Sequence, residues 1–197
     1  MKYIIAFLVF IVFIIGCTSP LVKEQCKDVP DYEKEECTIQ VAVDNKDMDI
    51  CNSLKDKTKL FCYQRVALEM RDKLLCTKMD DKYWADICYK TIAEATGDSS
   101  ACFSVNNEKD KNDCLSNIGI SQNKQEVCEM ITDNEIMDKC LREVAEGLKD
   151  ENVCAKISVS IKKAACFSSL ADLKNQSAIC QKISIPQIKD ICVGKFS

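Results

Sequence analysis

The spacing of the cysteines is the feature of this sequence that most limits how the chain can fold. Fourteen of the fifteen cysteines alternate gaps of 11 or 12 residues with gaps of 14, and only Cys17 lies outside the pattern. The fourteen form seven successive pairs: Cys26/Cys37, Cys51/Cys62, Cys76/Cys88, Cys102/Cys114, Cys128/Cys140, Cys154/Cys166 and Cys180/Cys192. A period of 25 or 26 residues predicts an array of small repeats, each of which buries its apolar face by stacking on its neighbours.

Apolar residues keep a fixed distance from these cysteines. Three residues after each first cysteine comes one of the apolar residues Val29, Leu54, Met79, Val105, Ile131, Ile157 and Ile183. Four residues after each second cysteine comes Val41, Val66, Ile92, Ile118, Val144, Leu170 or Phe196, followed by Ala42, Ala67, Ala93, Gly119, Ala145, Ala171 or Ser197. Such offsets fit a helix, so we expect both cysteines on apolar helix faces, and the small residue where a neighbouring helix comes close.

Cap and turn residues indicate where the helices begin and end. Four repeats have an aspartate four residues before the first cysteine, where it can accept hydrogen bonds from the free amides of a starting helix: Asp47, Asp72, Asp98 and Asp150. Gly97 suits the left-handed residue that ends the preceding helix. The turn signals inside the repeats are Asp80-Asp81, Asn106-Asn107, Thr132-Asp133, and Ser184 ahead of Pro186. We therefore predict a short helix of about eight residues, a turn and a longer helix of about fourteen in each repeat.

The first seventeen residues differ from the rest of the chain. Met1 and Lys2 precede an unbroken apolar run of twelve residues, 4–15, which is too short for a membrane span and fits the central region of a signal peptide. The sequence Ile14-Ile15-Gly16-Cys17 resembles the lipobox of prokaryotic lipoproteins. This resemblance implies that Cys17 is acylated and becomes the first residue after cleavage. We accordingly expect a signal peptide (1–16), a lipidated tether (17–23) and a seven-repeat array (24–197); the alternative is an uncleaved signal anchor with an incidental cysteine.

The paired cysteines are predicted to form disulfides. An exported chain leaves the reducing cytosol, fourteen is an even number, and the sequence has neither a histidine nor the C-x-x-C spacing of zinc or haem sites. Facing helices would place Cys76 about 6 Å from Cys88, whereas Cys88 and Cys102 would lie about 8–9 Å apart, too far for a disulfide. The expected fold is therefore all-α: a right-handed-type α-solenoid of seven short helical-hairpin repeats with one disulfide per repeat.

The repeat unit itself carries a second resemblance. Its pattern, apolar-C-x-x-[ILVM] followed by C-[LYF]-x-x-[ILV]-A, is similar to cysteine-rich helical repeats in predicted secreted proteins of archaea and some bacteria. By analogy with helical solenoids such as tetratricopeptide-like arrays, this resemblance implies a binding scaffold.

Charge and composition favour a binding protein over an enzyme. Without residues 1–16 the chain has 26 basic and 31 acidic residues, interspersed, and no basic stripe suggests nucleic acid. The lack of histidine excludes Ser-His and Cys-His pairs, and the five glycines form no phosphate-binding loop. No cofactor or metal site is predicted.

A few side chains invite other interpretations. The acidic cluster Glu33, Glu35 and Glu36 could hold a cation, but carboxylates are also favoured in a first helical turn. Trp84 could stack on a ligand, yet Ile136 and Ile188 occupy the equivalent position, which favours packing. The next candidate is Asn175, which begins the glycosylation sequon Asn175-Gln176-Ser177.

From the sequence we expect a lipoprotein on the extracytoplasmic face of the cell membrane, within the cell envelope. It would be held by its lipid anchor and act as a structural or protein-interaction scaffold for an unidentified protein partner. The alternative is a thiol-based metal-binding or redox protein, and a third possibility is an enzyme with a divergent carboxylate site.

Overall fold

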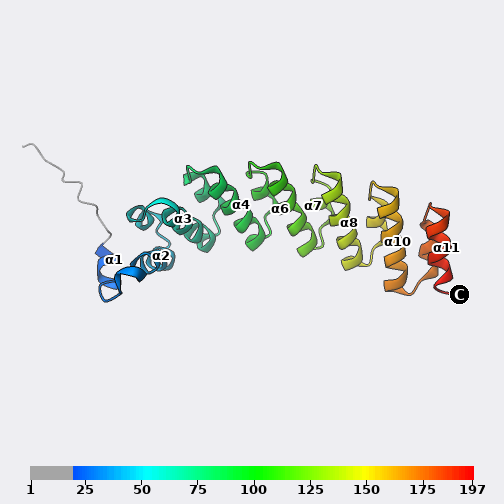
Figure 1. The fold of residues 1–197 in the computed structure, drawn as a ribbon, viewed down its shortest axis with the longest axis horizontal. Helices are drawn as coiled ribbons and strands as arrows, with labels where there is room; N and C mark the ends of the chain where they lie inside the picture. The colour runs from blue at the N-terminus through cyan, green and yellow to red at the C-terminus, as the bar shows by residue number, and fades with distance from the viewer. Residues whose placement is uncertain (1–19) are drawn as a thin grey trace, which may run out of the picture. The chain divides into compact units, whose positions relative to one another are not determined.

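The computed structural model describes residues 20–197, and in that part of the chain all regular secondary structure is helical (Figure 1). The helices are α1 (Pro20–Gln25), η1 (Asp31–Glu33), α2 (Lys34–Asp44), η2 (Met48–Ser53), α3 (Asp56–Met70), η3 (Lys73–Lys78), α4 (Lys82–Thr96), α5 (Ser99–Cys102), α6 (Glu108–Ser121), α7 (Gln125–Cys128), α8 (Asn134–Leu148), α9 (Glu151–Ala155), α10 (Ser160–Lys174), η4 (Ser177–Lys182) and α11 (Pro186–Gly194). Short and long helices alternate, which confirms the all-α repeat architecture. None of the helices between residues 20 and 197 has both the length and the apolar character needed to cross a membrane.

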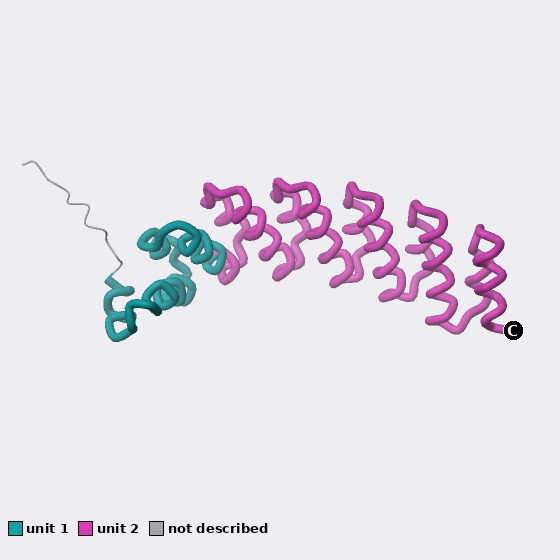
Figure 2. Tube along the Cα trace, in the orientation of Figure 1, with its two compact units in different colours: residues 1–66 teal, residues 67–197 magenta. Residues whose placement is uncertain are grey.

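The chain divides into two units, with the boundary inside α3 (Figure 2). Unit 1 ends at Val66 and contains the first hairpin and most of the second. Unit 2 runs from Ala67 to Ser197 and contains the remaining repeats. In unit 1, α1 begins at Pro20 and buries Val22, so the end of the segment predicted as a tether is helical.

The short helices are shorter than the predicted eight residues. They have four to six residues, and η2, η3 and η4 are 3-10 helices. The cause is the apolar residue three places after the first cysteine. Met79 is extended rather than helical (φ −89, ψ 116), and its N–H donates to the carbonyl of Cys76 at 3.2 Å, so the chain leaves the helix there. Its equivalents in the second to seventh repeats are still buried, as predicted, but they enter the core from a turn.

The predicted caps are confirmed. The side chains of Asp47, Asp72, Asp98 and Asp150 each accept a hydrogen bond from the N–H two residues later, at 2.9 Å. At the internal turns, Asp81, Asn107 and Asp133 cap α4, α6 and α8, and Pro186 begins α11. Each of these capping side chains satisfies an amide that the helix cannot satisfy itself.

The long helices share one way of ending. Six equivalent residues that follow them have positive φ, between 51° and 70°: Lys46, Arg71, Gly97, Asn123, Lys149 and Asn175. After α4 the N–H of Gly97 itself donates to Ala93 O at 2.7 Å, whereas at the other five ends the next N–H turns back to the carbonyl of the small residue, as in Asp150 N to Ala145 O at 3.0 Å. This is the Schellman arrangement. The sequence signalled only the position of Gly97, because the left-handed conformation costs other residues about 1–2 kcal/mol.

Within unit 2 the long helices α4, α6, α8, α10 and α11 pack on one another in chain order (Figure 1). The small residue lies at these contacts, as predicted. A Cβ built on Gly119 would lie 2.8 Å from Sγ of Cys128 and 2.9 Å from Sγ of Cys140, so Gly119 rests directly on the disulfide of the next repeat. Its equivalents Ala93, Ala145 and Ala171 are fully buried. One continuous core therefore runs from Ala93 near the end of α4 to Cys192 in α11.

Candidate functional site

All seven predicted disulfides are closed within repeats, as the helix geometry predicted. They join Cys26 to Cys37, Cys51 to Cys62, Cys76 to Cys88, Cys102 to Cys114, Cys128 to Cys140, Cys154 to Cys166 and Cys180 to Cys192. Their Cα–Cα distances are 5.6–6.0 Å, close to the expected separation of about 6 Å. This pairing confirms the predicted connectivity in every repeat.

The disulfides differ in how deeply they are buried. The twelve cysteines from Cys51 to Cys192 have no exposed surface, including Cys62 in α3 and Cys114 in α6. In the first repeat Cys26 is buried, whereas Cys37 in α2 is only partly buried. In this oxidised form no cysteine between residues 20 and 197 offers a thiolate for metal binding or nucleophilic attack.

The acidic cluster of the first repeat contacts the second repeat. Glu35 accepts a hydrogen bond from Thr58 at 3.1 Å, and Glu36 pairs with Arg65 at 3.0 Å. Both glutamates lie in the first turn of α2, where they also favour the helix dipole. Within residues 20–197, no group of three or more metal-binding side chains is placed to hold an ion.

The other singled-out residues are found at separate places. Trp84 is half-buried in the first turn of α4 and meets Tyr83 edge-on, with 6.3 Å between ring centroids. Asn175 is exposed and left-handed (φ 51) at the end of α10, and its glycosylation stays a prediction. Cys17 lies outside the described residues, so its lipidation also stays a prediction. The structure does not bring these residues together into one site.

We call the contact between two successive repeats a joint. Sequence reasoning missed a series of buried polar residues at these joints. Asp86, Asn112 and Asp138 each lie two residues before the second cysteine of their repeat and accept hydrogen bonds from the internal turn of the next repeat. Asp138, only 1% exposed, accepts from the N–H of Ser158 at 2.7 Å and of Val159 at 3.1 Å. The available signal was a polar residue on an apolar helix face, recurring at 26-residue intervals.

The electrostatics of Asp86 follow from these contacts. Burial by itself would raise the pKa of Asp86, but the hydrogen bonds donated by Asn106 and Asn107, together with the nearby charge of Lys90, outweigh it and hold that pKa below its ordinary value. In the same joint, the hydrogen bond from Lys73 lowers the pKa of Asp98. Both carboxylates are therefore more stable as anions in the folded chain than in the unfolded chain.

Ion pairs also link successive repeats at the surface of unit 2. They are Lys73–Asp98, Lys90–Asp110, Lys156–Glu129, Lys162–Glu135, Lys182–Glu151 and Lys195–Asp172. Single exposed pairs contribute about 0–1 kcal/mol each, so these ion pairs add little to the stability of the joints.

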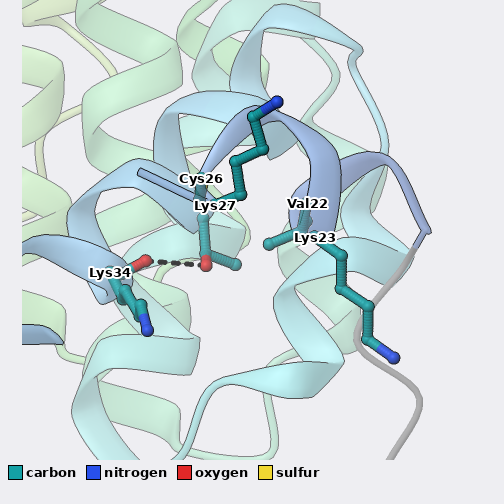
Figure 3. Close-up of a pocket in the computed structure, with 6 residues that line it drawn as sticks. Val22, Lys23, Cys26, Lys27 and Lys34 are labelled. Atoms are coloured by element: carbon teal, nitrogen blue, oxygen red, sulfur yellow. Dashed lines mark hydrogen bonds between the residues drawn. The ribbon is translucent and has the colours of Figure 1, made fainter. Parts of the chain in front are cut away.

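Surface hollows large enough to receive a side chain or a small ligand are present in both units. In unit 1, a pocket of about 310 Å³ lies between α1 and α2, lined by Val22, Lys23, Cys26, Lys27, Lys34 and Thr38 (Figure 3). Figure 3 shows the labelled lysine side chains extending in different directions, so their ammonium groups do not converge on one anion. In unit 2, a groove of about 270 Å³ lies between α8 and α10, lined by Glu135, Ile136, Asp138, Lys139, Arg142 and Lys162. We call it the α8–α10 groove.

Comparison of the chain with protein-family models, with curated proteins and with solved structures finds no match.

Proposed function

We propose that this chain is a lipoprotein anchored through Cys17 to the extracytoplasmic face of the cell membrane, where its helical array serves as a structural or protein-interaction scaffold. The observation that carries the proposal is the closure of one disulfide in every repeat. Disulfides persist outside the reducing cytosol, and they are favoured where small units cannot build a sufficient core alone. This agrees with the export signal and lipobox-like sequence that precede the array.

The construction of the repeats supports the scaffold half of the proposal. Each repeat is closed by its own disulfide, as Cys102–Cys114 closes the fourth, and is linked to the next by a buried small residue and by surface polar contacts. Because a stacked array presents side chains from many repeats along one surface, it suits contact with a partner protein. The residues that could suggest a catalytic or metal site either pack against neighbouring residues or lie at separate places in the described part of the chain.

The anchoring half is tested by replacing the acylated residue. Cys17→Ser should abolish incorporation of labelled fatty acid and leave the chain uncleaved by lipoprotein processing or mislocalised, because the sulfur that carries the lipid is gone. One acyl chain gives only marginal attachment, so wild-type protein should carry at least two. Thr18→Ser is the matched control and should behave as wild type. A lipid-free native N-terminus that begins at another residue would contradict the proposal.

The scaffold half is tested by chemical cross-linking on intact cells. We expect a reproducible partner whose cross-links fall on exposed residues of consecutive repeats, since a surface spanning several repeats makes the contact. The reduced and alkylated chain, in which the repeats are no longer closed, is the control and should lose the partner. The scaffold interpretation is wrong if the folded chain yields no partner.

A further inference from the structure

The α8–α10 groove differs from the other joints in its charge. Arg142 lies two residues after the second cysteine of repeat five, and Lys162 lies four residues before the second cysteine of repeat six. In the joint between repeats three and four, the same two positions are Lys90 and Asp110, whose side chains form a salt bridge of 2.8 Å. The same two positions therefore carry opposite charges in the joint between repeats three and four, but two cations in the joint between repeats five and six.

The cations of this groove differ in their partners. Among residues 20–197, exposed Arg142 has neither an ion-pair nor a hydrogen-bond partner for its side chain. Lys162 approaches Glu135 at 3.7 Å, but the Glu135 side chain is 88% exposed. Lys139 is 4.0 Å from Glu143. The lining thus combines the three cations Lys139, Arg142 and Lys162 with the two carboxylates Glu135 and Asp138, and Arg142 is the cation without a partner in the described part of the chain.

The remaining lining residues give the groove an apolar wall and place its charged side chains. Ile136 is half-buried against the core and supplies an apolar wall. Asp138 also lines the groove, where its carboxylate accepts hydrogen bonds from the amides of Ser158 and Val159. Lys139 and Arg142 are three residues apart on α8 and therefore lie on one helix face.

We propose that the α8–α10 groove binds an acidic peptide segment of a partner protein. Charge complementarity supports this occupant: the groove lining has three cations against two carboxylates, on a chain that carries a net negative charge, and its Arg142 is unpaired within residues 20–197. A carboxylate can pair with the guanidinium of Arg142 through two parallel hydrogen bonds, and the apolar wall of Ile136 can receive an aliphatic stem. This binding proposal rests on the proposed scaffold function, but its test does not depend on membrane anchoring.

The test is a titration of the full chain with a fluorescein-labelled octapeptide of glutamate, followed by fluorescence anisotropy at constant ionic strength. The double substitution Arg142→Glu with Lys162→Glu should weaken binding by at least about tenfold, since it replaces two attractions by two repulsions. Arg142→Lys should weaken it less, because the charge remains and only the paired hydrogen bonds are lost. Lys109→Glu, a charge reversal at an exposed residue of α6, is the control and should leave binding near the wild-type value.

Three outcomes would overturn the proposal. One is equal binding by the wild type and the double variant. Another is equal binding of a labelled octaglutamine peptide, which would mean that charge plays no part. The third is complete displacement of the peptide by inorganic phosphate at an equal concentration of negative charge, which would identify a site for small anions. Failure of the membrane assays with Cys17→Ser would leave these measurements unaffected, so the two proposals can fail separately.

Discussion

Two neighbouring joints of unit 2 have the same packing but different turn chemistry. Between repeats five and six, fully buried Ala145 supplies the close approach and Asp138 holds the turn of the next repeat. Between repeats six and seven, Ala171 is likewise buried, but Ala164 occupies the position of Asp138 and offers no acceptor. The array therefore stacks without the buried carboxylate. Stacking depends on apolar contact and a small residue, whereas the carboxylate adds order to the turn.

The largest expected effect comes from the disulfide of repeat six, which belongs to both joints. Replacing Cys154 and Cys166 by alanine should cost about 3 kcal/mol through the lost loop closure, plus a cavity contribution. Because Asp138 still holds the turn on one side, hydrogen exchange should show greater loss of protection in the joint with repeat seven. Uniform loss over residues 67–197 would mean that unit 2 unfolds as one cooperative body instead of repeat by repeat.

The next effect concerns Asp138 itself. Asp138→Ala should destabilise unit 2 by about 2 kcal/mol, because the amides of Ser158 and Val159 lose their acceptor. Asp138→Asn should cost less, since an amide oxygen can still accept, as Asn112 does from Thr132 at 3.0 Å. Chemical denaturation gives the free energies. If alanine and asparagine cost the same, the hydrogen bonds to the turn do not account for the effect.

Acid should separate the joint in which Asp86 is the acceptor from the joint in which Asn112 is the acceptor. The folded pKa of Asp86 is lowered from 3.8, so its stabilisation is complete above about pH 4 and is lost as the pH falls through the lower folded value. Between about pH 5 and pH 2.5, the exchange protection of the Asn106 amide should fall more than that of Thr132, after correction for intrinsic rates. Asp86→Asn should remove this difference; if it persists, another group is titrating.

The joint between repeats six and seven lacks a buried carboxylate, and a substitution can supply one. Ala164→Asp should stabilise the turn at Ser184 and Ile185 by about 1 kcal/mol, since the register places these amides where Asp138 finds Ser158 and Val159. Increased exchange protection of both amides would verify it. Reduced stability would show that the packing around Ala164 leaves no room for a carboxylate.

The smallest effect concerns the left-handed helix ends. Lys149→Gly should stabilise unit 2 by about 0.5 kcal/mol, because glycine adopts the positive φ of 53° without a steric penalty. The control is Lys163→Gly in the interior of α10, which should cost about 1 kcal/mol. Thermal unfolding of both variants checks the sign, and destabilisation by Lys149→Gly would mean that its side chain makes a compensating contact.

The repeat, the helical class and the disulfide pairing could be predicted because each follows from local spacing. Cysteines eleven or twelve residues apart across a tight turn have one geometrically suitable partner, and the capping aspartates act within their own helix. The length of the short helices could not be predicted in the same way. An apolar residue at an offset of three fits a helix and a turn equally well, and only the hydrogen bond from Met79 to Cys76 distinguishes them.

The sequence by itself thus determined what each repeat is made of, since helix period, caps and crosslinks act over a few residues. Only the tertiary structure decided how one repeat meets the next. Asp138 looks like an ordinary polar residue until the turn of repeat six is placed against it, twenty residues along the chain. Arg142 and Lys162 are likewise two separate surface cations until stacking sets them on one groove. The small residue at these contacts could be predicted, but which polar side chains meet across them depends on positions that no local rule relates, so the candidate binding surface emerged only from the assembled fold.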